Sequence, residues 1–246
     1  MKLTARDRLV DVLRLLRLNR AAARWVYRLE GFKTANVSVV EAAGRALEHV
    51  RAEGIAGDYL EFGVFKGASL LHAQQTADRL GIRGMRFLGF DSFAGLPEEP
   101  DQKRPLFYAG QYACGEAKVR RWLTRGGADW TRLQLVPGFY DRTLTPQTKR
   151  ELGLSACAAA MLDCDVASST ELALAWIEDL LVPRAVVVLD DWNAYGDGPE
   201  SWEDGQRRAL RAHARRSRWT FEPFFHYGAG LRGGQAFLVE PRSTTG

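Results

Sequence analysis

The chain lacks the features of membrane-spanning, secreted and zinc-dependent proteins. Its 246 residues include no run of about 18 apolar residues, so no membrane span is predicted. The three cysteines, Cys114, Cys157 and Cys164, follow neither a metal nor a disulfide spacing, and their odd number favours a reducing compartment. Arg14 and Arg17 interrupt the leucine-rich N-terminal segment, which therefore lacks the apolar core of a signal peptide. We expect a soluble, cytoplasmic protein that does not bind a membrane.

Lysine is scarce, and arginine supplies most of the positive charge. Lysine and arginine together number 34 against 30 acidic residues, which gives a net charge of +4. Arginines cluster between residues 6 and 28 and between residues 207 and 218, as on some nucleic-acid-binding surfaces. Acidic residues are interspersed among them, and neither an aromatic stacking platform nor a helix-turn-helix pattern accompanies them. We therefore expect solvated helix surfaces and no nucleic-acid partner.

The first fifty residues have helical periodicity. Leu9, Val12, Leu13 and Leu16 form an apolar stripe between arginines, and further helices are predicted over residues 21–29 and 39–51. We assign residues 1–54 to an N-terminal helical extension. Such an extension would cover an active site, form a homodimer or pack on the fold, and the sequence does not distinguish these roles.

From Gly57 the pattern alternates between strands and helices, which predicts an α/β fold over residues 55–246. Near-continuous apolar runs, of the kind found in strands buried on both faces, recur along this part of the chain. We expect a doubly wound, mostly parallel seven-stranded sheet with helices on both faces, in which the last two strands pair as an antiparallel edge. The predicted strands cover residues 58–64, 86–91, 131–136, 158–163, 185–190, 219–225 and 235–240, and the predicted helices cover residues 68–80, 116–125, 169–181 and 204–216.

The first two strands end in residues that suit an adenosine-type ligand. Gly63 and Gly67 allow a tight turn before a helix N-terminus, but their spacing is not that of a dinucleotide-binding loop. Glu61 would repel a pyrophosphate and suits a cationic ligand, such as a sulfonium or an amino group. Asp91 ends the second strand, where a carboxylate can accept hydrogen bonds from the two hydroxyls of a ribose. Its alternative role is to cap the turn at Ser92.

Carboxylates also follow the fourth and fifth strands, as Asp163-Cys164-Asp165 and Asp190-Asp191. Like charges so close together repel and raise one another's pKa unless a cation neutralises them. Oxygen ligands without a nearby histidine or cysteine pair favour a hard ion such as Mg²⁺. The alternative is that Asp165 caps the next helix and Asp191 faces solvent.

The four histidines form neither a His-x-x-x-His nor a Ser-His-Asp arrangement. His49 and His72 fall in predicted helices, where a structural role is expected. His226 lies near the end of a predicted strand and is a candidate general base, as is Asp191.

Five motifs in order resemble the macrocin O-methyltransferase family of class I S-adenosylmethionine-dependent enzymes. The resemblance covers about residues 55 to 195, and its most distinctive part is the stretch Phe90-Asp-Ser-Phe-Ala-Gly-Leu-Pro97. The other motifs begin at Asp58 (DYLEFGVFKG), Pro137 (PGFYDRTL), Leu162 (LDCD) and Leu189 (LDD).

The resemblance implies a cofactor site, a metal site and an acceptor. Glu61, Gly63 and Gly67 would hold the methionine part of S-adenosylmethionine, Asp91 its ribose, and Gly138 with Phe139 would lie near the adenine. The complete implied cofactor set is Glu61, Gly63, Val64, Phe65, Gly67, Ser69, Asp91, Ser92, Gly138, Phe139 and Asp163. The implied Mg²⁺ ligands are Asp163, Asp190 and Asp191. The expected acceptor is a small molecule with a hydroxyl, such as a vicinal diol on a sugar or a secondary metabolite.

One segment departs from the family pattern, and other functions remain open. After the Asp-x-Asp motif the family usually has an aromatic-acidic pair, whereas this chain has Val166-Ala-Ser-Ser169. A cofactor-binding protein without catalysis is therefore one alternative. A nicotinamide-dependent oxidoreductase on the same fold is a second, although Glu61 and the missing third glycine count against it. A metal-independent N- or C-methyltransferase is a third.

Overall fold

The computed structural model describes residues 37–98, 107–196, 198–230 and 233–242. The apolar stripe between Leu9 and Leu16, and with it the predicted dimer contact, lies outside the described residues. In the described part of the chain, no helix combines the length and the apolar character needed to cross a membrane.

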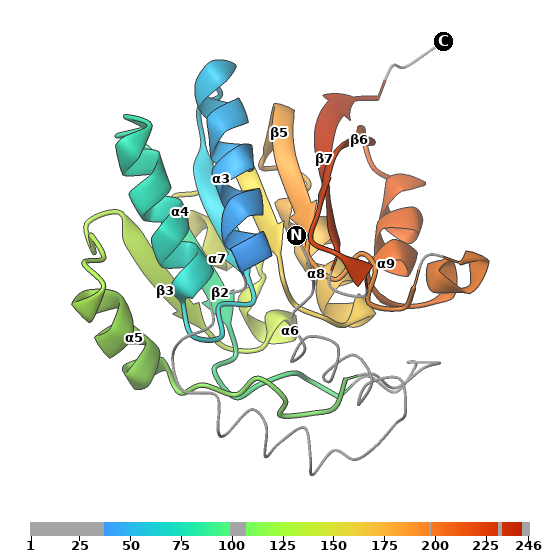
Figure 1. Cartoon of the computed structure of the whole chain (residues 1–246), viewed down its shortest axis with the longest axis horizontal. Coiled ribbons are helices and arrows are strands. Elements are labelled where there is room, and N and C mark those ends of the chain that lie inside the picture. The colour runs from blue at the N-terminus through green and yellow to red at the C-terminus, as the bar shows by residue number, and fades with distance from the viewer. Residues whose placement is uncertain (1–36, 99–106, 197, 231–232, 243–246) are drawn as a thin grey trace.

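A single seven-stranded sheet forms the centre of the molecule (Figure 1), as the sequence predicts. The strand order is β3-β2-β1-β4-β5-β7-β6. The first five strands pair in parallel, β7 is antiparallel to β5, and β6 is antiparallel to β7, so the predicted antiparallel edge is confirmed. The strands are β1 (Asp58–Phe62), β2 (Phe87–Asp91), β3 (Leu133–Pro137), β4 (Cys157–Leu162), β5 (Leu181–Leu189), β6 (Trp219–Tyr227) and β7 (Gly234–Pro241).

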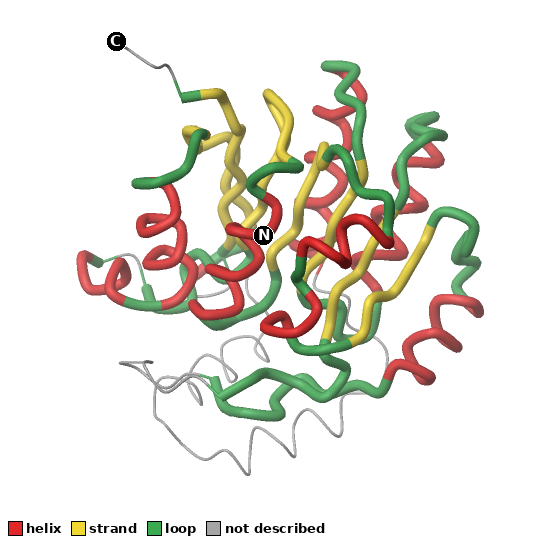
Figure 2. The backbone as a smooth tube through the Cα atoms, turned by 180° about the vertical axis from the view of Figure 1, so that it is seen from behind, coloured by secondary structure: helices red, strands yellow, loops and turns green. Residues whose placement is uncertain are grey.

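Helices cover both faces of the sheet (Figures 1 and 2). On one face lie α3 (Val37–Ala52), α4 (Ala68–Arg79) and α5 (Glu116–Arg125). On the other face lie α6 (Tyr140–Thr143), α7 (Pro146–Glu151), α8 (Ala167–Ile177) and α9 (Gly205–Ala214). A 3-10 helix, η1 (Pro199–Glu203), precedes α9. The central strands explain this layering, because all residues of β1 and β4 are buried and both of their faces need apolar cover.

Helix α3 packs in the core of the sheet domain. Its apolar side chains, among them Val39, Leu47 and Val50, belong to the same buried cluster as residues of β1, β4 and β5. Arg45 on its outer side lies 3.9 Å from the centre of the Phe225 ring on β6. These residues fall within the N-terminal extension predicted over residues 1–54. In the fold they bury one face of the sheet.

Some boundaries differ from the sequence expectation for local reasons. Strand β5 begins at Leu181, four residues before the predicted start, although Pro183 and Arg184 interrupt the apolar pattern. Arg184 has a φ of 63°, and the pairing register with β4 shifts between Cys157 and Ala159. Helices α6 and α7 are too short to give a periodic signal. Helix α7 begins at Pro146 after Thr145, whose hydroxyl accepts the Thr148 N–H at 3.1 Å.

Candidate active site

The carboxyl ends of β1, β2, β4 and β5 meet at one edge of the sheet, which we call the rim. The backbone there is strained. Phe65, Phe93 and Asp165 follow three of these strands and adopt positive φ values of 48°, 55° and 61°. Such conformations cost about 1–3 kcal/mol for residues with a side chain, and they collect at functional sites. The strained residues therefore lie at the same edge of the sheet as the sequence motifs.

Gly63 lets the loop after β1 pass close to the end of β4. Its φ is +96°, and a Cβ atom there would lie 1.8 Å from the carbonyl oxygen of Asp163. The Asp163 N–H donates to the carbonyl of Phe62 at 2.8 Å, which fixes this approach. Gly67, with a φ of +80°, turns the chain into α4 beneath the Leu123 side chain. The two glycines thus bring the predicted cofactor loop against Asp163.

Glu61 is completely buried beneath this loop. Its carboxylate accepts the Ser69 hydroxyl at 2.7 Å and the Tyr59 hydroxyl at 3.1 Å. Burial raises the pKa of Glu61 to about 7, although the bonds from Ser69 and Tyr59 oppose the shift. Two predicted site residues, Glu61 and Ser69, therefore contact each other, with the carboxylate facing the first turn of α4.

Asp91 holds three backbone N–H groups of the rim. Its Oδ2 atom accepts the N–H groups of Val64 and Phe65, each at 2.8 Å, and Oδ1 accepts that of Phe93 at 2.6 Å. An ionised carboxylate has about four acceptor positions, so the count leaves one for a ligand. The Ser92 hydroxyl accepts the Ala94 N–H and donates to the Gly95 carbonyl within its own turn.

Gly138 and Phe139 lie beside Asp91, at the end of β3. The Gly138 N–H donates to the Asp91 carbonyl at 2.9 Å, and its φ of +134° brings it against Thr143. Phe139 is the N-cap residue of α6, and its carbonyl accepts the Thr143 hydroxyl at 3.0 Å. The predicted ribose and adenine residues are therefore neighbours.

Asp163, Asp190 and Asp191 form a cluster at the rim. One carboxylate oxygen from each lies within 4.8 Å of the others. The pKa of Asp163 is raised well above its usual range, first by burial and then by the charges of Asp190 and Asp191. These oxygen-only donors fit a hard divalent cation such as Mg²⁺, whose charge would offset their repulsion.

Two residues that the sequence analysis missed hold this cluster. The Tyr227 hydroxyl donates to Asp190 Oδ1 at 2.7 Å, and its pKa is raised well above the usual range by burial and by the Asp190 charge. The Gln206 side chain accepts the Asp191 N–H at 2.9 Å. Neither residue belongs to a recognisable motif, although Tyr227 directly follows His226. Asp165 also contacts the cluster, because its N–H donates to Asp191 Oδ2 at 2.9 Å.

His226 lies on β6, two strands away from the carboxylate cluster. It pairs with Gln235, which pairs with Leu189, so His226 and Leu189 are about 10 Å apart across the sheet. His226 is exposed, and a Cβ atom at Gly233 would lie 3.0 Å from its ring and 2.5 Å from Asn193 Nδ2. His226 therefore lies at the same edge of the sheet as Asp190, and the absence of a side chain at Gly233 leaves room for both His226 and Asn193.

A small apolar cluster borders the rim where the sequence departs from the family pattern. Val166 is buried and packs with side chains from the segments after β2 and β5. Apolar side chains therefore lie beside the rim at this position. The cluster consists of Leu96, Phe107, Tyr112, Val166, Ala194 and Tyr195.

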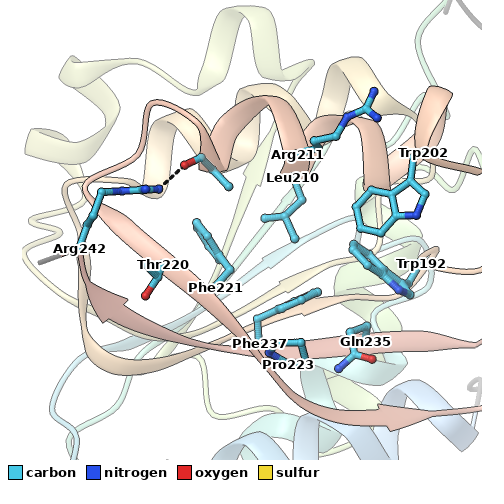
Figure 3. A pocket seen from close by; sticks show the side chains of 11 residues that line it. Trp192, Trp202, Leu210, Arg211, Thr220, Phe221, Pro223, Gln235, Phe237 and Arg242 are labelled. Carbon is cyan, nitrogen blue, oxygen red and sulfur yellow. Dashed lines mark hydrogen bonds between the residues drawn. The ribbon is translucent and has the colours of Figure 1, made fainter.

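An open, largely apolar groove of about 560 Å³ lies between α9 and strands β6 and β7 (Figure 3). Trp192 and Gln235 line the end of the groove that is nearer the carboxylate cluster. At the other end the Arg242 guanidinium donates to the carbonyl of Ala214. The carboxylate cluster itself is not part of its lining, so the groove is a separate feature beside the rim.

The model of the macrocin O-methyltransferase family, TylF, matches residues 38–213. The chain belongs to this family. The match includes every residue of the predicted cofactor and metal sites and ends before His226 and Tyr227. The residues that the resemblance singles out therefore lie within the part that the family shares.

Curated relatives of this family member are natural-product methyltransferases. One, from Streptomyces olivaceus, is named 8-demethyl-8-(2,3-dimethoxy-alpha-L-rhamnosyl)-tetracenomycin-C 4'-O-methyltransferase, and it is 29% identical over 153 residues. That match covers 59% of this chain and 57% of the relative. Mycinamicin III 3''-O-methyltransferase from Micromonospora griseorubida is 24% identical over 155 residues, which cover 59% of each chain. The matched part thus spans less than two thirds of either relative.

Solved structures agree on the fold. The crystal structure of a calicheamicin methyltransferase superposes with a TM-score of 0.66 at 21% identity, over 97% of this chain and 94% of the other. The seven-stranded sheet with flanking helices is therefore that of the class I methyltransferases.

Proposed function

We propose that this family member is an S-adenosylmethionine-dependent O-methyltransferase that acts on a sugar hydroxyl of a secondary metabolite. The observation that carries the proposal is the position of three clustered carboxylates beside a glycine loop and Asp91 at one edge of a class I sheet. The names of the curated relatives, one of which specifies a rhamnosyl group, support a sugar as the acceptor. A vicinal diol suits the site because its two oxygens can share one cation.

The cofactor would bind along the loop from Gly63 to Gly67 and across Asp91. The N-terminus of α4 offers backbone N–H groups to its carboxylate, and Asp91 would accept a ribose hydroxyl at its remaining acceptor position. Gly138 and Phe139 would border the adenine. Val64, Phe65 and Ser92 would contribute through the backbone of the same turns.

Asp163, Asp190 and Asp191 would hold Mg²⁺. When bound, S-adenosylmethionine supplies the methyl group, and Mg²⁺ lowers the pKa of the acceptor hydroxyl and orients it. Tyr227 donates a hydrogen bond to the Asp190 carboxylate, and the apolar cluster around Val166 would limit the access of water to the rim. Most of the rate would come from positioning and from charge stabilisation.

Asp191 and His226 remain the candidates for proton acceptor, and Asp165 joins them. Asp165 is bonded to Asp191 through its backbone, and its carboxylate contributes to the raised pKa of Asp163. A carboxylate that binds the metal is a weaker base, which favours a group beside the ligands over a ligand itself. Turnover by Asp165→Asn, Asp191→Asn and His226→Gln, measured against pH, distinguishes the three, because loss of the base removes the ascending limb of the profile.

Calorimetric titration with S-adenosylhomocysteine tests the cofactor site. We expect micromolar binding that Asp91→Ala abolishes and that Asp163→Asn leaves nearly unchanged. A glycosylated diol panel then tests activity, and we expect turnover to be lost in Asp163→Asn and in excess EDTA. Wild-type turnover under both conditions would exclude the metal role. Tight cofactor binding without turnover across the panel would instead support a binding protein that has lost catalysis.

A further inference from the structure

The Gln206 side chain connects the two segments that carry the carboxylate cluster. Its Oε1 atom accepts the Asp191 N–H at 2.9 Å, and its Nε2 atom donates to the Leu162 carbonyl, also at 2.9 Å. Leu162 directly precedes Asp163. One side-chain amide therefore joins the backbone beside the first carboxylate to the backbone of the third.

The fold gives Gln206 little freedom to move. It is only 1% exposed, in the first turn of α9. The Asp204 carboxylate caps this helix by accepting the Gly205 N–H at 2.9 Å. Gly205 has a φ of +59°, and a Cβ atom there would lie 2.6 Å from the Tyr195 ring. The backbone before Gln206 is therefore fixed on both sides.

We call the two hydrogen bonds of the Gln206 amide, to Leu162 and to Asp191, the bridge. The bridge lies directly beyond the last paired residues of β4 and β5. The ladder closes with Leu162 opposite Leu189, and the Asp190 N–H adds one more bond to the Leu162 carbonyl at 3.0 Å. Beyond this point the Asp165 N–H reaches the Asp191 side chain, at Oδ2, whereas the amide of Gln206 reaches the Asp191 backbone. Gln206 thus extends the backbone connection between the segments that carry Asp163 and Asp191 by one residue.

We propose that Gln206 is a positioning residue that sets the affinity of the carboxylate cluster for its divalent cation. The inference rests on the proposed metal site. A cation needs its ligands at a fixed separation, and without Gln206 the two segments beyond the strand ladder would be joined through the Asp165 N–H bond to the Asp191 carboxylate, itself a proposed ligand. Loss of such an outer-shell partner typically weakens metal binding by about 10- to 100-fold.

The chain contains a matched control for the bridge. Gln74 on α4 is also 1% exposed, and its amide makes the same double contact with a backbone. It donates to the Asp129 carbonyl at 3.0 Å and accepts the Asp129 N–H at 2.8 Å. Asp129 lies before β3, at the opposite edge of the sheet from the rim. Gln74→Met and Gln206→Met therefore remove equivalent bonds, only one set of which adjoins the cluster.

The experiment is calorimetric titration with MgCl₂ of the wild type, Gln206→Met, Gln74→Met and Asp163→Asn, together with the thermal unfolding of each. We expect both glutamine variants to lose similar stability. We expect Gln206→Met alone to bind Mg²⁺ about 10- to 100-fold more weakly than the wild type, with unchanged affinity for S-adenosylhomocysteine. Gln206→Asn, which retains the amide on a shorter side chain, serves if Gln206→Met does not fold, and an intermediate loss is expected.

Two different failures are distinguishable. Wild-type Mg²⁺ affinity in Gln206→Met, or an equal loss of affinity in Gln74→Met, would overturn the positioning role while leaving the metal site intact. No Mg²⁺ binding by the wild type would overturn the metal site and the positioning role together, whereas the cofactor titration would still report on the methyltransferase proposal.

Discussion

Glu61 shows how burial changes the properties of a single side chain. Its carboxylate is fully buried, and its pKa is raised from 4.5 to about 7. The unfolded chain therefore loses this proton at a lower pH than the folded protein does. The stability that the protonated form contributes is complete below the unfolded pKa, and it is lost as the pH rises through 7.

Glutamine is neutral at every pH, so Glu61→Gln avoids the cost of burying an ionised carboxylate. We therefore expect the substitution to raise the free energy of unfolding, relative to the wild type, and to raise it by about 2 kcal/mol more at pH 8 than at pH 5. Urea denaturation at the two pH values measures the difference. Glu48→Gln removes an exposed carboxylate from α3 and is the matched control, whose curve should follow that of the wild type. An equal change in the free energy of unfolding at pH 5 and pH 8 would contradict a raised pKa of Glu61.

The residues of the rim were predictable from the sequence to different degrees. Asp163, Asp190 and Asp191 follow apolar strands directly, so parallel pairing alone brings them to one edge. Gln206 and Tyr227 could not be found in this way. Their partners lie far along the chain, and only the packing of α9 and the register of β6 bring them into contact.

At the scale of elements, the pairing of β6 with β7 determines where the Tyr227 hydroxyl lies. Tyr227 pairs with Gly234, and a Cβ atom at Gly234 would lie 2.2 Å from the Tyr227 ring. The glycine thus provides the space in which the phenol reaches Asp190. A side chain there would force the ring to move and break its bond to the carboxylate.

We expect Gly234→Ala to weaken Mg²⁺ binding about tenfold, as Tyr227→Phe should, because both remove the same bond to Asp190. The double variant should show little further loss. Calorimetric titration of the three variants with MgCl₂ is the measurement. Gly44→Ala on α3 is the control, since a Cβ atom there meets nothing within 4 Å. If the losses of Mg²⁺ affinity in Gly234→Ala and Tyr227→Phe added up in the double variant, Gly234 would not act through the bond between Tyr227 and Asp190.

The predictability of the elements themselves follows from their burial and length. Strands β4 and β5 consist largely of buried apolar residues and were found from their apolar runs. Helix α6 has four residues and α7 has six, which is too short for a helical period to be recognised. Their ends depend on local caps, such as Thr145, rather than on an apolar stripe.

At the scale of the whole molecule, α3 shares one buried apolar cluster with the sheet. Its Leu47 side chain is fully buried in a cluster that includes Tyr59, Ala159 and Val186. Packing on the fold was one of three roles that the sequence left open for this segment, because an amphipathic helix before the first strand suits a cover, a dimer contact or a core helix equally well. The packed interior therefore begins well before the first strand.

We expect Leu47→Ala to lower the free energy of unfolding by about 2–5 kcal/mol, with a single transition, because it leaves a cavity in the shared core. Chemical denaturation followed by circular dichroism and by tryptophan fluorescence measures both quantities. Leu172→Ala on α8, where the leucine is 42% exposed, is the matched control and should change stability by less than about 0.5 kcal/mol. Two separated transitions would show that α3 unfolds independently of the sheet.

The antiparallel edge also affects how the molecule behaves at high concentration. Strand β6 is the last strand of the sheet, and such a strand has backbone groups to which a strand from another molecule can bind. Pro223 has no N–H group, and the register shifts between Pro223 and Phe225, so the strand is irregular at its middle. Glu222 and His226 on either side are exposed and polar. The strand that brings Tyr227 to the rim is thus irregular at the position where a strand from another molecule would pair, although Phe224 beside Pro223 is an exposed apolar side chain.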